Sequence, residues 1–98
     1  MIVRVVKMTF APGQDERFLD LFAGWAPRIR GFPGCRHLEL LRGTDDPRVF
    51  FTYSRWDCPE ALAAYRGSPV FAEVWPTVKA MFAERAEAWT VEQAAVLP

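Results

Sequence analysis

The chain has 98 residues, of which 51% are hydrophobic and 24% charged, and its 12 basic side chains balance its 12 acidic ones. These values are typical of one folded domain, residues 1–98, and exclude a disordered chain. Balanced charge argues against nucleic acid as a partner, and no apolar run approaches the roughly 18 residues of a membrane span. Arg4 and Lys7 interrupt the stretch where a secretion signal needs apolar residues, so we expect a cytoplasmic protein.

The first half of the chain alternates between strand and helix patterns. Residues 2–10 are rich in β-branched side chains, which predicts a strand. After a Pro-Gly turn, apolar residues recur at three- and four-residue spacing from residue 14 to about residue 30, which predicts a helix. Residues 35–42 and 48–56 predict two further strands, and the turn-forming residues between them are of hairpin length.

Two helix-start signals follow the third strand. Asp57 and Glu60 resemble a capping box, with Asp57 as the N-cap of a short helix that stops at Gly67. Ser68 followed by Pro69 is the second signal, because serine favours the N-cap and proline the first helical position.

The helix that begins after Ser68 should break before Pro76 and resume toward residues 82–84, because proline cannot donate an intrahelical hydrogen bond. Residues 87–93 alternate between polar and apolar side chains and predict a last strand. The resulting order, β-α-β-β-α-β, predicts an α+β fold of the ferredoxin-like type, with helices on one face of a four-stranded antiparallel sheet.

Alternation along the strands predicts two faces of this sheet, if Arg42 pairs with Arg48. The more apolar set should lie under the helices: Ile2, Val6, Met8, Phe10, Leu38, Leu40, Phe50, Thr52 and Trp56. The other set is mixed: Val3, Val5, Lys7, His37, Glu39, Leu41, Val49, Phe51, Tyr53 and Arg55. A face that carries several of these apolar side chains is too apolar to stay exposed, so we expect a homodimer in which a second sheet covers it. Its contact residues would include Val3, Val5, His37, Phe51 and Tyr53.

Three segments resemble the antibiotic biosynthesis monooxygenase domain family. They are residues 31–42 (GFPGCRHLELLR), 46–56 (DPRVFFTYSRW) and 60–71 (EALAAYRGSPVF). The resemblance implies a dimeric α/β barrel, in which two ferredoxin-like protomers join sheet to sheet, and a pocket between the sheet and the helices. Activities in the family include oxidation of anthrones or quinols by dioxygen without a cofactor, and haem degradation. Many members have no assigned reaction.

The resemblance extends to some functional positions of the family. The cofactor-free oxidases place a tryptophan at the end of the third strand, which Trp56 matches, whereas Thr52 stands for their asparagine and Leu62 for their tyrosine. One of these three positions is therefore retained. In the family's cofactor-free chemistry the substrate itself gives the electron to dioxygen, so we expect no bound cofactor.

The haem-degrading members match less well. Trp75 occupies the position of their histidine ligand, Val6 that of their asparagine and Tyr65 that of their tryptophan. The missing iron ligand disfavours haem degradation.

Four side chains are candidates for the wall of a substrate pocket: Thr52, Trp56, Tyr65 and Trp75. Three are aromatic and would suit a small, flat aromatic ligand, although ordinary core packing would also explain them. The Tyr65 hydroxyl could steady an enolate oxygen. No residue is assigned as a catalytic base.

His37, the only histidine, is the obvious candidate for a base, but the alternation places it on the sheet–sheet face and away from the pocket. Cys35 and Glu39 are expected on that same face. A metal there would need ligands from both protomers, so no metal site is expected.

Three hypotheses for function follow. The first is a cofactor-free monooxygenase of a small electron-rich aromatic, such as a quinol or anthrone. This reaction needs a pocket that excludes water, a donor for the developing oxyanion and deprotonation of the substrate. The second is a non-catalytic dimeric module that binds a small ligand or has a structural role, which the lack of a convincing base favours. The third, haem degradation, is disfavoured.

Overall fold

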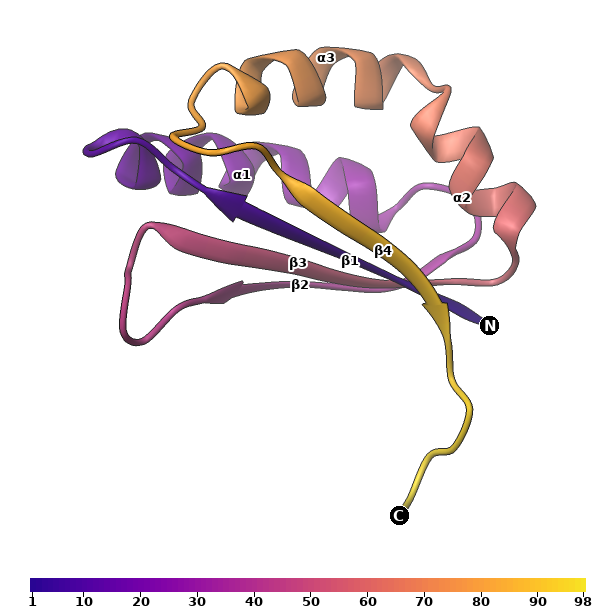
Figure 1. The fold of residues 1–98 in the computed structure, drawn as a ribbon. Coiled ribbons are helices and arrows are strands. Elements are labelled where there is room, and N and C mark those ends of the chain that lie inside the picture. The colour runs from indigo at the N-terminus through magenta and orange to yellow at the C-terminus, as the bar shows by residue number, and fades with distance from the viewer.

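Four strands and three helices make up the structure, a computed structural model that describes all 98 residues (Figure 1). In chain order they are β1 (Ile2–Thr9), α1 (Gln14–Arg30), β2 (Cys35–Arg42), β3 (Val49–Trp56), α2 (Pro59–Arg66), α3 (Pro69–Lys79) and β4 (Glu87–Glu92). No helix combines the length and the apolar character that crossing a membrane requires.

The strands form one antiparallel sheet in the order β2-β3-β1-β4. All three helices lie over the same face of this sheet and leave the other face bare (Figure 1). This is the ferredoxin-like arrangement that the element order predicts, with the second helical connection divided into α2 and α3.

The core between sheet and helices consists of two clusters. The larger joins strand residues Met8, Phe10 and Phe50 to Phe18 of α1 and Val78 of α3. The smaller cluster lies under α2 and contains Ile2, Cys35, Trp56 and Leu62. The strand members of both clusters lie on the face that alternation predicts to be covered by helices, apart from Cys35.

The predicted pairing of β2 with β3 is wrong by two residues. Arg42 pairs with Phe50 rather than with Arg48, and Leu40 pairs with Thr52. Successive side chains of a strand point to opposite faces, so a shift of two residues exchanges partners but leaves each side chain on its predicted face.

A bulge at the start of β2 overturns the expected position of Cys35. Cys35 pairs with Trp56 and the next pair is His37 with Arg55, so β2 has one extra residue here. The bulge turns the Cys35 side chain under α2, away from the bare face that carries His37. Gly34, with φ of 89°, precedes the bulge, and a Cβ there would lie 2.5 Å from the Cβ of Ala61. Only glycine therefore lets the chain enter β2 this close to α2.

The predicted capping box at Asp57 is not formed. The N-cap of α2 is Cys58, which makes no side-chain cap, and both carboxylate oxygens of Asp57 accept hydrogen bonds of 2.7 Å from Arg36. A bidentate ion pair between β2 and the end of β3 thus replaces the local cap. The Ser68 cap is confirmed, because its Oγ accepts a hydrogen bond of 3.2 Å from the Phe71 amide.

The predicted break before Pro76 is also wrong, because α3 runs without interruption to Lys79. Pro76 leaves the Ala72 carbonyl without its usual donor. Both residues lie on the exposed side of the helix, where water can hydrate that carbonyl. Phe82 forms an isolated bridge with Phe10 instead of resuming the helix.

The bare face of the sheet carries the residues predicted to contact a second protomer. Val3 is already buried within the protomer, whereas Val5, His37, Phe51 and Tyr53 are half-buried. Apolar side chains on the two edge strands, β2 and β4, are more exposed: Leu41 (46%), Trp89 (45%) and Val91 (48%). The C-terminal tail leaves the body on the side of this face (Figure 1).

Candidate functional site

A cavity of about 310 Å³ lies between the covered face of the sheet and the helices. Such a volume is at the lower end of the range of small-molecule sites, roughly 300–1,000 Å³. The lining is mostly apolar: Val6, Met8, Phe18, Phe22, Ile29, Leu38, Trp56, Leu62, Tyr65, Phe71, Val74, Trp75, Val78, Ala86 and Ala88, with Arg4, Thr52, Ser54 and Arg66 as the polar members. The lining contains no histidine, aspartate, glutamate or cysteine.

All four residues predicted to form a pocket wall line this cavity. Thr52 and Trp56 come from β3, Tyr65 from α2 and Trp75 from α3. The Trp56 and Tyr65 rings stack at a centroid distance of 5.1 Å, and Phe71 joins the row by an edge contact with Tyr65 and a stack on Trp75. The cavity therefore has an aromatic wall that crosses from the sheet to both short helices.

Trp56 forms a rigid part of this wall. Its side chain is 1% exposed, and its indole nitrogen donates a hydrogen bond of 3.0 Å to Ser54 Oγ. The Ser54 hydroxyl in turn donates to the Arg4 carbonyl at 3.4 Å. Ser54 is thus satisfied within the protein and holds the indole in place, so it is not available to a ligand.

Thr52 and Tyr65 provide the hydroxyls that remain available in the cavity. Neither hydroxyl makes a hydrogen bond within the chain, and both side chains are only partly buried. Burial, with a smaller effect from the neighbouring Cys35, raises the pKa of Tyr65 to about 12. At neutral pH the phenol is therefore protonated and can donate a hydrogen bond to an oxygen of a ligand.

His37 lies on the other side of the sheet. Its Nε2 is 3.0 Å from a carboxylate oxygen of Glu39, and its ring meets the edge of Tyr53 at 5.9 Å. It cannot reach a ligand in the cavity, because the sheet separates them. No group of three or more histidine, cysteine or acidic side chains is close enough to hold a metal ion.

The two charged residues of the cavity were not among the predicted pocket residues. Arg4 lies between Ile2 and Val6 on the covered face of β1, and Arg66 is the last residue of α2. A signal for Arg4 was present, because a charged side chain interrupts the apolar alternation of residues 2–10. For Arg66 there was no such signal, since a cation in the last turn of a helix is common.

The fold and the cavity define the class: a ferredoxin-like α+β protein with an aromatic-walled pocket between its sheet and its helices. The model of the antibiotic biosynthesis monooxygenase family matches residues 1–76, more than half of the chain. The chain therefore belongs to this family. No curated protein matches its sequence.

Solved structures share the whole fold. A crystal structure of an antibiotic biosynthesis monooxygenase has a TM-score of 0.90 and 18% identity, over 97% of this chain and 100% of that one. Rv0793 from Mycobacterium tuberculosis gives 0.89 and 16%, over 99% and 98%. A mutant of SnoaB, a cofactor-independent oxygenase from Streptomyces nogalater, gives 0.88 and 22%, over 99% and 96%. At these identities the likeness establishes the fold and not the reaction.

Proposed function

We propose that the protein is a monooxygenase that oxidises a small electron-rich aromatic, of the quinol or anthrone type, with dioxygen and no cofactor. The observation that carries this proposal is the cavity with its aromatic wall and two available hydroxyls, Thr52 and Tyr65. Family membership and the likeness to a cofactor-independent oxygenase support it.

In this proposal the protein binds and orients the substrate, which itself supplies the electrons. The aromatic row beside Trp56 holds the ring, and the surrounding apolar side chains shield most of it from water. Tyr65, which keeps its proton, donates a hydrogen bond to the oxygen that gains negative charge when the substrate ionises. Thr52 is the second donor.

The reaction balances without a further reductant. For an anthrone, the substrate methylene loses two hydrogens and gains one oxygen atom of dioxygen as a carbonyl. The other oxygen atom leaves with the two hydrogens as water. No cavity residue can act as a carboxylate or imidazole base, so the proton that starts the reaction passes to solvent.

Dioxygen uptake with 1,8-dihydroxyanthrone tests the proposal. We expect the protein to accelerate uptake beyond the spontaneous autoxidation of this compound, in proportion to protein concentration. Heat-denatured protein is the control. If uptake with native and denatured protein is equal, the proposed activity is absent for this substrate class.

The alternative is a non-catalytic module that binds a small aromatic ligand, and the lack of a base in the cavity favours it. Quenching of tryptophan fluorescence by the ligand without accelerated oxygen uptake would support this alternative. Haem degradation has no counterpart here, because the cavity offers no histidine to bind iron and Trp75 occupies the position of that ligand.

We also propose that two protomers join through the bare face of the sheet in the cytoplasm. The half-buried apolar residues of that face, with Trp89 and Val91 at its edge, support an interface. Arg55 adds a second argument, since its Nε is buried without a hydrogen-bond partner while Glu39 is engaged by His37. An acceptor from a second protomer would satisfy it.

A further inference from the structure

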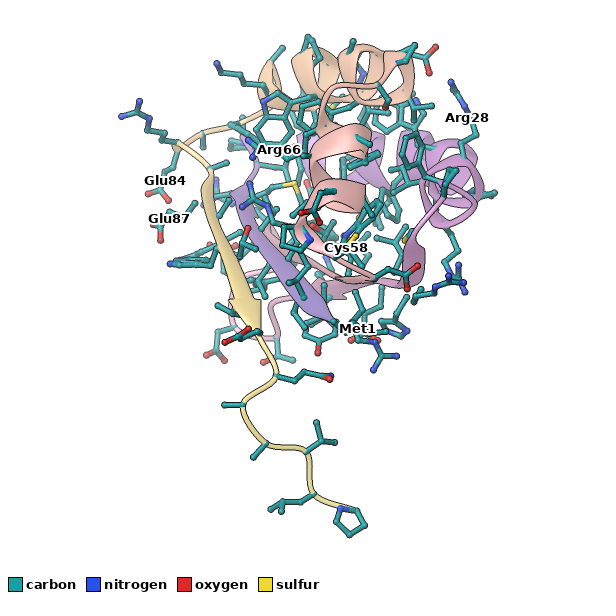
Figure 2. The ribbon with its side chains drawn as sticks, turned by 90° about the vertical axis from the view of Figure 1, so that its right-hand side faces the viewer. Met1, Arg28, Cys58, Arg66, Glu84 and Glu87 are labelled. Carbon is teal, nitrogen blue, oxygen red and sulfur yellow. The ribbon has the colours of Figure 1, made fainter.

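Two arginines stand together at the rim of the cavity. Arg4 rises from β1 on the covered face, and Arg66 comes from the end of α2. Arg66 reaches toward the β1–β4 edge of the sheet, whereas Glu84 and Glu87 lie on the other side of β4 (Figure 2). Arg66 and Ala88 are both exposed and both line the cavity, so the cavity reaches solvent here.

Neither guanidinium has a carboxylate partner. Arg28, Arg36, Arg42 and Arg48 form ion pairs with acidic side chains, but neither Arg4 nor Arg66 is within 4.0 Å of one. The hydrogen bond that Arg4 makes through its side chain goes from Nη1 to the neutral Thr90 hydroxyl on β4, at 2.8 Å. This contact orients the guanidinium without neutralising it.

The arrangement is electrostatically unfavourable as it stands. Burial lowers the pKa of Arg4, and repulsion by Arg66 lowers it further. Arginine remains charged even so, which leaves two like charges beside an apolar cavity. Arg66 alone is explained by the favourable position of a cation at a helix C-terminus, but that does not explain a charge on the covered face of β1. An anion between the two guanidiniums would remove the repulsion.

We propose that this arginine pair binds the carboxylate of an aromatic acid whose ring lies in the cavity. The pair offers guanidinium N–H groups suited to both oxygens of a carboxylate, and both arginines line the same cavity as Tyr65 and the rest of the aromatic wall. The proposal rests on the proposed function. Within the proposed substrate class it adds a preference, expressed as tighter binding, for quinols or anthrones that carry a carboxylate.

A matched pair of redox-stable probes tests this inference. One is 1-hydroxy-2-naphthoate and the other is its methyl ester, which keeps the rings and the phenol but has no charge. Their dissociation constants are measured by quenching of tryptophan fluorescence at neutral pH. We expect the acid to bind about tenfold more tightly than the ester, because a hydrogen-bonded charge pair adds this much or more. The advantage should shrink as salt is added.

Variants separate the arginine pair from general surface charge. Arg66→Gln should weaken binding of the acid about tenfold and leave that of the ester within about twofold. Arg17→Gln is the matched control, because Arg17 is an arginine on α1 that is outside the cavity and has no acidic partner. Arg66 is exposed, so its substitution is not expected to affect folding.

The outcomes distinguish the two proposals. Equal binding of acid and ester, or equal effects of Arg66→Gln and Arg17→Gln, would overturn the carboxylate site and leave the aromatic cavity intact. The arginine pair could instead bind the ionised phenol of the probes. Binding of the ester would then strengthen as the pH rises and would depend on Arg66, and this result too would overturn the carboxylate site. If neither probe binds, the aromatic cavity and the carboxylate site both fail.

Discussion

Tyr65 is the side chain through which the cavity can act on a substrate oxygen. Tyr65→Phe keeps the ring stacked on Trp56 and removes only the hydroxyl. If that hydroxyl donates to the developing oxyanion, the substitution should slow oxygen uptake about 100- to 1,000-fold. Stability should change by less than about 0.5 kcal/mol, because the hydroxyl makes no hydrogen bond within the chain. Tyr53→Phe is the control, since the same atom is lost from the bare face of the sheet.

The pH dependence of stability tests the burial of the same phenol. The pKa of Tyr65 is raised to about 12 in the folded protein, from 10.0 for an ordinary tyrosine. Below pH 10.0 the folded and the unfolded chain both keep the phenol proton, so the free energy of unfolding is at its full value. As the pH rises from 10.0 toward about 12, only the unfolded chain releases the proton, and the free energy of unfolding falls. Urea titrations should therefore show a steeper loss of stability in this window for the wild type than for Tyr65→Phe. Parallel curves would mean that the phenol is not buried.

The sheet face on which a single residue lies could be predicted where the alternation of side chains along a strand alone determines it. Thr52 and Trp56 are four residues apart in one strand, so both had to face the helices. The proximity of Arg4 to Arg66 could not be predicted, because it depends on how the end of α2 lies over β1. No pattern along the chain carries that information.

At the scale of elements, the junction of α2 and α3 depends on Ser68. Its hydroxyl accepts from the Phe71 amide at 3.2 Å and donates to the Tyr65 carbonyl at 2.6 Å, so one side chain joins both helices. Ser68→Ala should lower the free energy of unfolding by about 1 kcal/mol, within a range of roughly 0.5–2 kcal/mol. Ser68→Thr should restore most of the loss in a urea titration. If alanine and threonine behave alike, the hydroxyl is not the cap.

The elements also separate what local signals determine from what they do not. Apart from that of Cys35, the face on which each strand side chain lies was predicted correctly although the register of β2 and β3 was wrong by two residues, because both registers give the same alternation. The Asp57 cap failed because Arg36, 21 residues away, binds the carboxylate more strongly than the backbone of α2 does. The bulge at Cys35 likewise depends on the contact of Gly34 with α2. Such long-range contacts are invisible to local patterns.

At the scale of the whole molecule, the bare face of the sheet predicts a dimer. Sedimentation equilibrium at micromolar concentration should give twice the chain mass of 11.2 kDa. Phe51→Glu should shift the equilibrium toward the monomer, because it places a charge in the middle of the proposed interface. Ala72→Glu, on the exposed side of α3, is the control and should remain dimeric. A wild-type protein that sediments as a monomer would contradict the dimer.

The fate of dioxygen tests most directly whether the cavity is the site of a monooxygenase. The measurement is the incorporation of isotope-labelled dioxygen into the product formed from 1,8-dihydroxyanthrone, by the wild type and by Thr52→Phe, which fills the cavity next to Trp56. We predict that the wild type accelerates the transfer of one labelled oxygen atom into the product, and that the folded Thr52→Phe variant gives only the spontaneous rate. Equal acceleration by both proteins would place the reaction outside the cavity, and no acceleration by the wild type would contradict the monooxygenase itself.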